Sequence, residues 1–331
     1  GFSGKKCSLT VMYCLLKGKY KSNWIKYMKI ATTPRVLYYH IVADKFPEIY
    51  PNGISVSNFF RQLGQLKRQG YKFRSLSEVL ANPKKFNDKD IVLTFDDGFS
   101  TNYPVLMYLC KEYNIKPTVF LIGKCIDNKE MAWNHKLLLM KRYCSPVKLS
   151  AQIDNYVPGA TISSLFSRIE MSEKDTVTDS LWKEVMPFSE SDYLQKHKPF
   201  LSLAQMKSLQ KAGVEFGIHS WSHPDFSRLI YPEAYTELDL CFKQMEELSV
   251  PCKRYFAYPY GRPAQNEIET RLIKNFQLSA TFGISYGLGD NSLPYTRWQR
   301  IKMDGRKLTN REQFLLLPLL RSIKASRFNF L

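Results

Sequence analysis

The chain of 331 residues is 44% hydrophobic and 14% aromatic, which excludes a disordered protein and allows one large α/β domain or two smaller ones. The formal net charge of +18 indicates an anionic neighbour, such as a phospholipid surface, an acidic or phosphorylated glycan carrier, or nucleic acid. The seven cysteines are scattered and never form a Cys-x-x-Cys pair, which argues against a disulfide framework or a zinc ribbon and is typical of a reducing compartment.

Residues 1–32 form a basic segment before the first predicted strand. Seven lysines and no acidic residue occur in residues 1–30, interleaved with aromatic side chains. This composition is typical of a segment lying on an anionic membrane face, and equally of a solvated helix packed on the domain. The apolar run Ser8–Leu16 is shorter than the roughly 18–20 residues that span a bilayer, and lysines follow it instead of a small-residue cleavage site. We therefore expect a cytoplasmic protein, with peripheral membrane binding as an option.

From residue 33 to 303 the sequence alternates between strand-like and helix-like patterns. The expected strands lie at 35–42, 71–73, 91–95, 116–123, 214–218, 255–258, 278–282 and around Arg300 and Ile301. The expected helices lie at 57–69, 75–80, 101–113, 202–213, 232–248 and 266–275. The helix at 202–213 is expected to open with a Ser-x-x-Gln capping box at Ser202 and Gln205. Such alternation predicts parallel βα units, so we expect an α/β protein built as a distorted barrel, with its chemistry at the carboxyl ends of the strands.

Two stretches depart from this alternation. Residues 124–200 carry mixed charges and no clear repeat, so we expect a helical insertion in the barrel. Residues 304–331 are expected to form a C-terminal helix, which opens with a capping box at Thr309 and Glu312. Pro318 interrupts its apolar run, which favours a core or interface helix over a membrane helix. The expected domains are thus 1–32, the barrel 33–303 and the helix 304–331.

Two adjacent acids, Asp96 and Asp97, follow the predicted strand Ile91–Phe95. The apolar and β-branched residues of this strand predict burial on both faces. Since Asp and Gly are ordinary turn residues, a simple Asp-Asp-Gly turn ending at Gly98 is the alternative interpretation. Two unpaired charges in such a place are costly to desolvate, which favours a metal-binding or catalytic task for at least one of them.

Two histidines, His219 and His223, follow the predicted strand 214–218. One helical turn would bring both imidazoles to one side, and the chain has only five histidines in all. One carboxylate plus two histidines is a donor set that suits zinc or a neighbouring first-row metal. Paired surface or core histidines are the alternative interpretation.

A third motif is the aromatic strand 255–258, which runs into Pro259-Tyr260-Gly261. This rigid turn offers a surface on which a sugar face could stack. Pro-Tyr-Gly turns are common, so this motif gains its weight from the other two.

Together the three motifs resemble those of the polysaccharide deacetylase family, the NodB-homology or carbohydrate esterase family 4 group. The matching stretches are Thr94–Gly98, His219–His223 and Tyr258–Gly261, and the resemblance runs from about residue 33 to 303 outside the insertion. The resemblance implies a distorted (β/α)7-type barrel and a metal-dependent hydrolysis of N-acetyl, and sometimes O-acetyl, groups on sugars.

The resemblance also implies a role for each residue of the first two motifs. Asp97, His219 and His223 would hold one divalent metal ion, with Zn²⁺ as the first expectation and Ni²⁺, Co²⁺ or Fe²⁺ as alternatives. A divalent ion lowers the pKa of a bound water toward ~7. Asp96 would then be the general base that takes the proton of the attacking water.

In the third motif, the resemblance implies that the backbone N–H of Tyr260, in the turn that begins at Pro259, stabilises the oxyanion. The family often has an arginine two residues before this proline, which orients the catalytic acid residue. Here that position is Ala257. We expect Arg300, in the last predicted strand, to replace the missing arginine as the partner of Asp96.

Many members of the family have a late histidine that acts as general acid, yet no histidine follows His223 in this chain. A branch that acts on exported or capsule-type glycans places an equivalent histidine on the first strand, and Tyr39–Val42 matches that pattern. We therefore expect His40 to protonate the leaving amine, with a buried structural histidine as the alternative. His135 and His197 lie in the insertion and are expected to be surface residues.

The leading hypothesis is a metal-dependent N-deacetylase acting on N-acetylhexosamine residues of a surface polysaccharide or its lipid-linked precursor, at an anionic membrane surface. A catalytically weak glycan-binding relative and an amidohydrolase for a non-sugar acyl amide are the alternatives. Nucleic-acid binding would require a basic-aromatic groove and steep salt dependence, and no nucleic-acid motif is present, so no nucleic-acid partner is expected.

Overall fold

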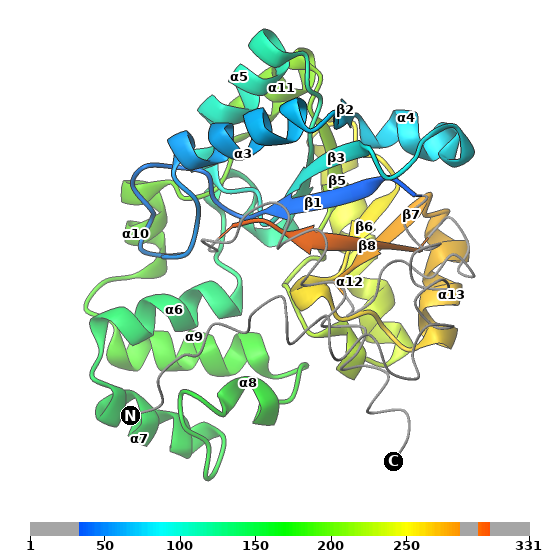
Figure 1. The fold of residues 1–331 in the computed structure, drawn as a ribbon. Coiled ribbons are helices and arrows are strands. Elements are labelled where there is room, and N and C mark those ends of the chain that lie inside the picture. Colours follow the sequence, from blue (N-terminus) through cyan, green and yellow to red (C-terminus); the bar gives the residue numbers. More distant parts are fainter. Residues whose placement is uncertain (1–32, 285–296, 305–331) are drawn as a thin grey trace, which may run out of the picture.

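The computed structural model describes residues 33–284 and 297–304, and in this part of the chain seven parallel strands close into a barrel (Figure 1). In order around the ring they are β1 (Arg35–Tyr39), β3 (Asp90–Phe95), β4 (Thr118–Leu121), β5 (Glu215–Ile218), β6 (Tyr255–Ala257), β7 (Ala280–Gly283) and β8 (Arg297–Lys302). An eighth strand, β2 (Lys72–Arg74), lies along the first half of β3, whose second half pairs with β4. The predicted (β/α)7-type barrel is confirmed.

Helices follow the strands and cover the outside of the barrel (Figure 1). They are α3 (Val56–Arg68), α4 (Leu76–Ala81), α5 (Tyr103–Tyr113), α11 (Leu203–Ala212), α12 (Tyr231–Glu247) and α13 (Asn266–Phe276), with short 3-10 turns at Pro83–Lys85, Ser100–Asn102, Gly123–Asn128, Phe226–Arg228 and Pro259–Gly261. The predicted capping box at Ser202 is present, since its side chain accepts from the N–H of Gln205. Gly213 then ends α11 in the left-handed conformation that favours glycine, with φ of 106°.

Strand β3 is buried along its whole length because both of its faces are covered. Its side chains alternate between two layers, as strand geometry requires. Val92 packs in the cluster that includes Phe120 and Phe282 of other barrel strands, whereas Leu93 and Phe95 join the cluster beneath the outer helices. This packing fixes the carboxyl end of β3, and with it the backbone at Asp96 and Asp97.

The predicted insertion is helical and forms a lobe beside the barrel (Figure 1). Its helices are α6 (Trp133–Tyr143), α7 (Pro146–Tyr156), α8 (Leu165–Arg168), α9 (Lys174–Val185) and α10 (Glu190–His197). The lobe shares a hydrophobic core with the barrel, because Trp133 and Leu181 belong to the same buried cluster as Ile218 and Phe256. The lobe is therefore packed onto the barrel through a common core.

The predicted basic segment 1–32 and the C-terminal helix that begins near Thr309 lie outside the described residues. Between residues 33 and 304, as far as the structure describes them, no helix is both long and apolar enough to cross a bilayer.

Candidate active site and metal centre

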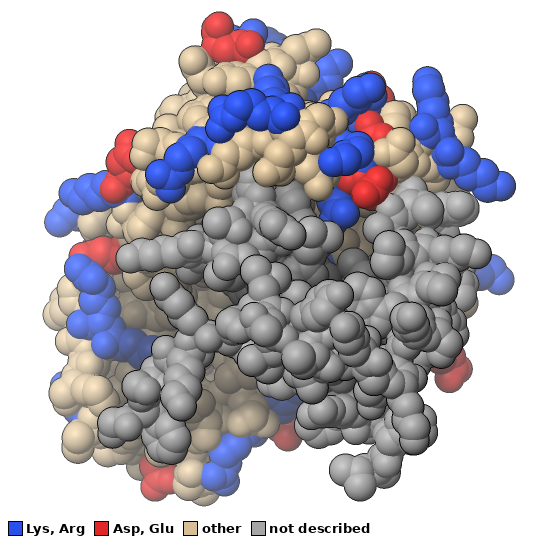
Figure 2. Space-filling model, viewed as in Figure 1, with Lys and Arg blue, Asp and Glu red and all other residues tan. Residues whose placement is uncertain are grey.

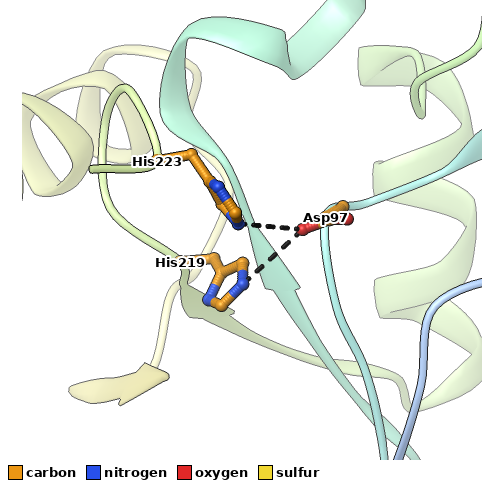
Figure 3. Close-up of side chains that lie close together, drawn as sticks. All are labelled: Asp97, His219 and His223. Atoms are coloured by element: carbon orange, nitrogen blue, oxygen red, sulfur yellow. Dashed lines mark ion pairs between the residues drawn. The ribbon is translucent and has the colours of Figure 1, made fainter. Parts of the chain in front are cut away.

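Asp97, His219 and His223 converge at the carboxyl ends of β3 and β5 (Figure 3). Oδ1 of Asp97 lies 3.5 Å from Nε2 of His219 and 3.6 Å from Nε2 of His223. All three side chains are buried, and their ligand atoms lie within 4.8 Å of one another. The sequence-predicted ligand residues therefore share one site.

The backbone places these residues through left-handed conformations. Asp97 and Gly98 have φ values of 67° and 73°, so the chain turns sharply after β3. The positive φ of Gly98 strains any other residue, and a Cβ atom there would also lie 2.7 Å from Cδ2 of Leu121, which would have to shift. The prediction that one helical turn joins His219 and His223 is wrong. They are joined by a loop in which Ser220 and His223 have φ of 69° and 62°, and the N–H of Ser222 in this loop donates to Oε2 of Glu237 of α12 at 2.8 Å.

The two imidazoles are held in a form that suits metal binding. Nδ1 of His219 donates to the carbonyl oxygen of Ala257 at 2.7 Å, so the lone pair of Nε2 faces Asp97. Burial lowers the pKa of both His219 and His223, which favours the neutral ring that coordinates metals. Oδ1 of Asp97 is buried without a hydrogen-bond partner among the described residues. One orphaned carboxylate oxygen and two neutral imidazoles fit a divalent first-row ion such as Zn²⁺.

Asp96 is paired with Arg300 on the neighbouring side of the same barrel end. The guanidinium donates from Nη1 to Oδ1 of Asp96 at 2.6 Å and from Nη2 to Oδ2 at 2.9 Å. Both side chains are almost completely buried, and the guanidinium carbon of Arg300 lies 4.8 Å from the ring centre of Tyr38. Arg300 thus occupies the position beside Asp96 that the sequence analysis expected for it.

His40 follows β1 and lies in an ion pair with Asp304. Its Nδ1 lies 2.8 Å from Oδ2 of Asp304, and its backbone N–H donates to the same oxygen at 2.8 Å. The ring stacks on Tyr50, and 16% of the side chain is exposed. Burial lowers the pKa of His40, but the charge and hydrogen bond of Asp304, together with the charges of Asp97 and Asp96, outweigh burial and the pKa is raised. The raised pKa favours the protonated imidazolium, which can donate a proton from Nε2.

We expect the Asp304→Asn variant to lose activity at a lower pH than the wild type as the pH is raised. An acid must be protonated to act, so activity falls as the pH rises through the raised pKa of His40. Asparagine removes the negative charge and moves this limb of the kcat profile to lower pH by about one unit or more. The raised pKa also means that the ion pair stabilises the fold at low pH and that this contribution is lost as the pH rises through the pKa of His40.

The matched control is Asp88→Asn, because Asp88 pairs with Arg35 at 3.6 Å at the start of β1, far from the site. This variant should keep the wild-type alkaline limb. An Asp304→Asn profile that coincides with the wild-type profile would contradict the pairing of His40 and Asp304 as a catalytic unit.

The third motif lies against the same site. Pro259–Gly261 forms a 3-10 turn in which Tyr260 has φ of 56°. The ring of Tyr260 packs edge-on against His223, with 4.7 Å between the ring centres, and its hydroxyl lies 3.4 Å from the carbonyl oxygen of His223. Burial raises the pKa of this hydroxyl well above its ordinary value, so it remains a neutral donor.

The insertion contributes a histidine that the sequence analysis placed wrongly on the surface. His135 is fully buried, and its Nε2 lies 3.6 Å from Oδ2 of Asp97. Helix α6 brings it there from the lobe, a contact that no local pattern encodes. His197, in contrast, is exposed at the end of α10, as predicted.

Two signals in the sequence could have identified the missed residues. Four of the five histidines in the chain lie at this site. The small number of histidines was an argument for a functional role of His219 and His223, and the same argument applies to His135. Asp304 lies shortly after β8, at the same carboxyl end of the barrel as Asp96 after β3.

Comparisons with known proteins agree with this geometry. The family model for polysaccharide deacetylases matches residues 83–279, more than half of the chain. YxkH of Bacillus subtilis (strain 168), provisionally named a polysaccharide deacetylase, is 23% identical over 203 residues, which cover 60% of this chain and 67% of YxkH.

Solved structures show the same fold. The Streptococcus pyogenes deacetylase PplD, solved in complex with acetate, has a TM-score of 0.53 at 19% identity, covering 87% of this chain and 98% of PplD. IcaB from Ammonifex degensii has a TM-score of 0.53 at 17% identity, covering 88% of this chain and 96% of IcaB. With the family match, these similarities show that the chain belongs to the polysaccharide deacetylase (NodB-homology) family and is a deacetylase of the hydrolase class.

Proposed function

We propose that this protein removes N-acetyl groups from N-acetylhexosamine residues of a surface polysaccharide or of its lipid-linked precursor, using one divalent metal ion. The observation that carries the proposal is the buried group of Asp97, His219 and His223 directly beside the Asp96–Arg300 pair. Among the relatives, a de-N-acetylase from Aggregatibacter actinomycetemcomitans shares the fold, with a TM-score of 0.50 at 16% identity, and PplD was solved with acetate, the product that such a reaction releases.

Asp97, His219 and His223 would hold the ion, with Zn²⁺ as the first expectation and Ni²⁺, Co²⁺ or Fe²⁺ as alternatives. When bound, such an ion supplies Lewis acidity, which polarises an acyl oxygen and makes water a better nucleophile near neutral pH. The burial of all three residues suits this chemistry, because exclusion of bulk water strengthens electrostatic stabilisation.

The chain's own residues divide the proton transfers between two sides of the site. Asp96 accepts the proton of the attacking water, and Arg300 fixes both of its oxygens in place while it does so. His40, whose protonated form is favoured by Asp304, donates a proton to the nitrogen of the departing amino sugar. The backbone N–H of Tyr260, in the turn that starts at Pro259, stabilises the developing oxyanion.

We also propose that an anionic membrane surface brings enzyme and substrate together. Exposed Arg61, Lys67 and Arg68 lie on α3, and Lys84 and Lys85 follow α4. Figure 2 shows Lys and Arg gathered along the upper rim of this face, where acidic side chains are fewer. In this proposal the segment 1–32 adds to the basic surface, the barrel 33–303 carries the reaction, and 304–331 forms the C-terminal helix.

The proposal is tested by metal analysis of the purified protein together with acetate release from N-acetylglucosamine oligomers, an O-acetylated glycan and a non-sugar acetamide. We expect about one metal ion per chain and fastest release from the N-acetylated oligomers. Chelation should abolish release, and added Zn²⁺ should restore it. Acetate release that continues after complete chelation of the metal would contradict the proposal.

The other outcomes identify the alternatives. Oligomer binding without acetate release would indicate a catalytically weak glycan-binding relative. Faster release from the non-sugar acetamide than from any glycan would indicate an amidohydrolase of another substrate class.

A further inference from the structure

The imidazole of His135 is buried beside Asp97. It is fully buried in the first turn of α6, and neither of its ring nitrogens has a hydrogen-bond partner among the described residues. Buried polar groups are almost always paired, because an unpaired one loses its hydrogen bonds to water. A buried histidine of this kind indicates that its ring forms a hydrogen bond when the site is in its active state.

The two oxygens of Asp97 face different histidines. Oδ1 faces the pair His219 and His223, whereas Oδ2 lies 3.6 Å from Nε2 of His135. This distance is slightly longer than a hydrogen bond, so a small movement of either side chain brings the donor into range. His135 is thus placed to decide which way the carboxylate turns.

The surroundings hold the ring of His135 against the site. Phe99 and Phe200 flank it, with ring centres 5.4 Å and 5.5 Å away. Two residues earlier in the chain, Nε1 of Trp133 donates to the carbonyl oxygen of His223 at 2.9 Å. The first turn of α6 is therefore tied to the loop that carries the second histidine of the pair.

The next residue anchors the same turn to the rest of the lobe. The side chain of Lys136 is buried, and its Nζ lies 2.7 Å from Glu190 of α10 and also pairs with Asp179 of α9. Because α6 is fixed on both of its sides, His135 cannot withdraw without disrupting the lobe.

We propose that His135 is a positioning residue for the metal ligand Asp97: its Nε2–H holds Oδ2 and keeps Oδ1 turned toward His219 and His223. The insertion is then a working part of the metal site. Among the described residues, the group of ligand atoms within 4.8 Å of one another consists of Asp97, His219 and His223 and does not include His135, which favours positioning over direct ligation. The inference rests on the proposed function, in that it assumes a bound metal ion.

The test compares Zn²⁺ affinity, measured by competition with a chromophoric chelator, among variants of the full chain. His135→Leu removes the donor and should weaken Zn²⁺ binding about 10- to 100-fold, as expected for loss of a group that orients a ligand. His135→Gln carries an amide nitrogen near the position of Nε2 and should restore most of the affinity. His135→Asn is too short to do so and should behave like His135→Leu. His197→Gln, on the exposed end of α10, is the control and should match the wild type.

A second measurement separates positioning from ligation. The visible spectrum of the Co²⁺-loaded protein reports the ligands and geometry around the ion. Positioning predicts that His135→Gln keeps the wild-type spectrum, and a changed spectrum would show that His135 is a ligand and overturn the inference. Equal Zn²⁺ affinity in the Gln and Asn variants would overturn it as well, and this comparison remains decisive if His135→Leu does not fold.

The inference and the proposed function fail in different ways. A wild-type protein that binds Zn²⁺ but releases no acetate from any substrate leaves the positioning role of His135 intact and removes the deacetylase proposal. If the metal-loaded enzyme releases acetate normally but every His135 variant keeps the wild-type Zn²⁺ affinity, the deacetylase proposal stands and the positioning role of His135 is overturned.

Discussion

Asp96→Asn should lower kcat for acetate release by about 100- to 10,000-fold, the usual contribution of a general base. Asparagine has almost the same shape as aspartate but cannot take up a proton from the attacking water. Because Asp97 and not Asp96 faces the histidine pair, Zn²⁺ affinity should stay close to that of the wild type. The measurement is kcat on N-acetylglucosamine oligomers at saturating Zn²⁺, together with chelator competition.

Asp90→Asn is the matched control for this variant. Asp90 begins the same strand β3, is buried, and pairs with Nε of Arg74 at 2.9 Å, so the substitution is identical but lies at the opposite end of the barrel. It should destabilise the protein without changing kcat of the folded enzyme. A wild-type rate in Asp96→Asn would show that another group takes the proton.

Arg300→Met should lower the free energy of unfolding by about 3–5 kcal/mol, because it leaves a carboxylate buried without its partner. Only 3% of the side chain of Asp96 is exposed, so water cannot replace the two hydrogen bonds that Arg300 supplies. Activity should fall too, since the base loses its fixed orientation. Urea unfolding of the metal-free protein measures the stability change separately from any contribution of bound metal.

A double-mutant cycle isolates the interaction. In the Asp96→Asn background no buried charge is left behind, so adding Arg300→Met should cost much less stability than it does in the wild type. The stability of Arg300→Lys should lie between those of the wild type and Arg300→Met, because lysine keeps the charge but loses the paired donors of the guanidinium. Equal losses in both backgrounds would mean that Arg300 stabilises the barrel through its contact with Tyr38 and not through Asp96.

The elements that were predicted correctly are those with a strong local pattern. The apolar run before Asp96 became the fully buried strand β3, and the Ser-x-x-Gln stretch at Ser202 became the capping box of α11. Both patterns depend on neighbours within a few residues, where strand alternation and helix capping operate. The first two motifs were recognisable for the same reason, since their spacing is short and each follows a strand.

The prediction of a helical turn between His219 and His223 was wrong because contacts with distant residues, not the local spacing, determine the backbone there. Spacing of four residues is compatible with a helix, but it is equally compatible with a loop that reverses direction through left-handed residues. The choice was made by packing around the loop, where Ser222 bonds to Glu237 of α12 and Trp133 bonds to the carbonyl oxygen of His223. Neither partner is near the loop in sequence.

By itself, the sequence determined the barrel class, the acids after β3 and the histidine pair after β5, because these rest on hydrophobic periodicity and on rare residues at strand ends. Only the tertiary structure decided that Asp304 pairs with His40 across 264 positions and that His135 reaches Asp97 from the insertion. Barrel closure joins β8 to β1, and the lobe packs through a shared core. Contacts of this kind depend on which distant surfaces bury one another, and no local pattern in the chain records that.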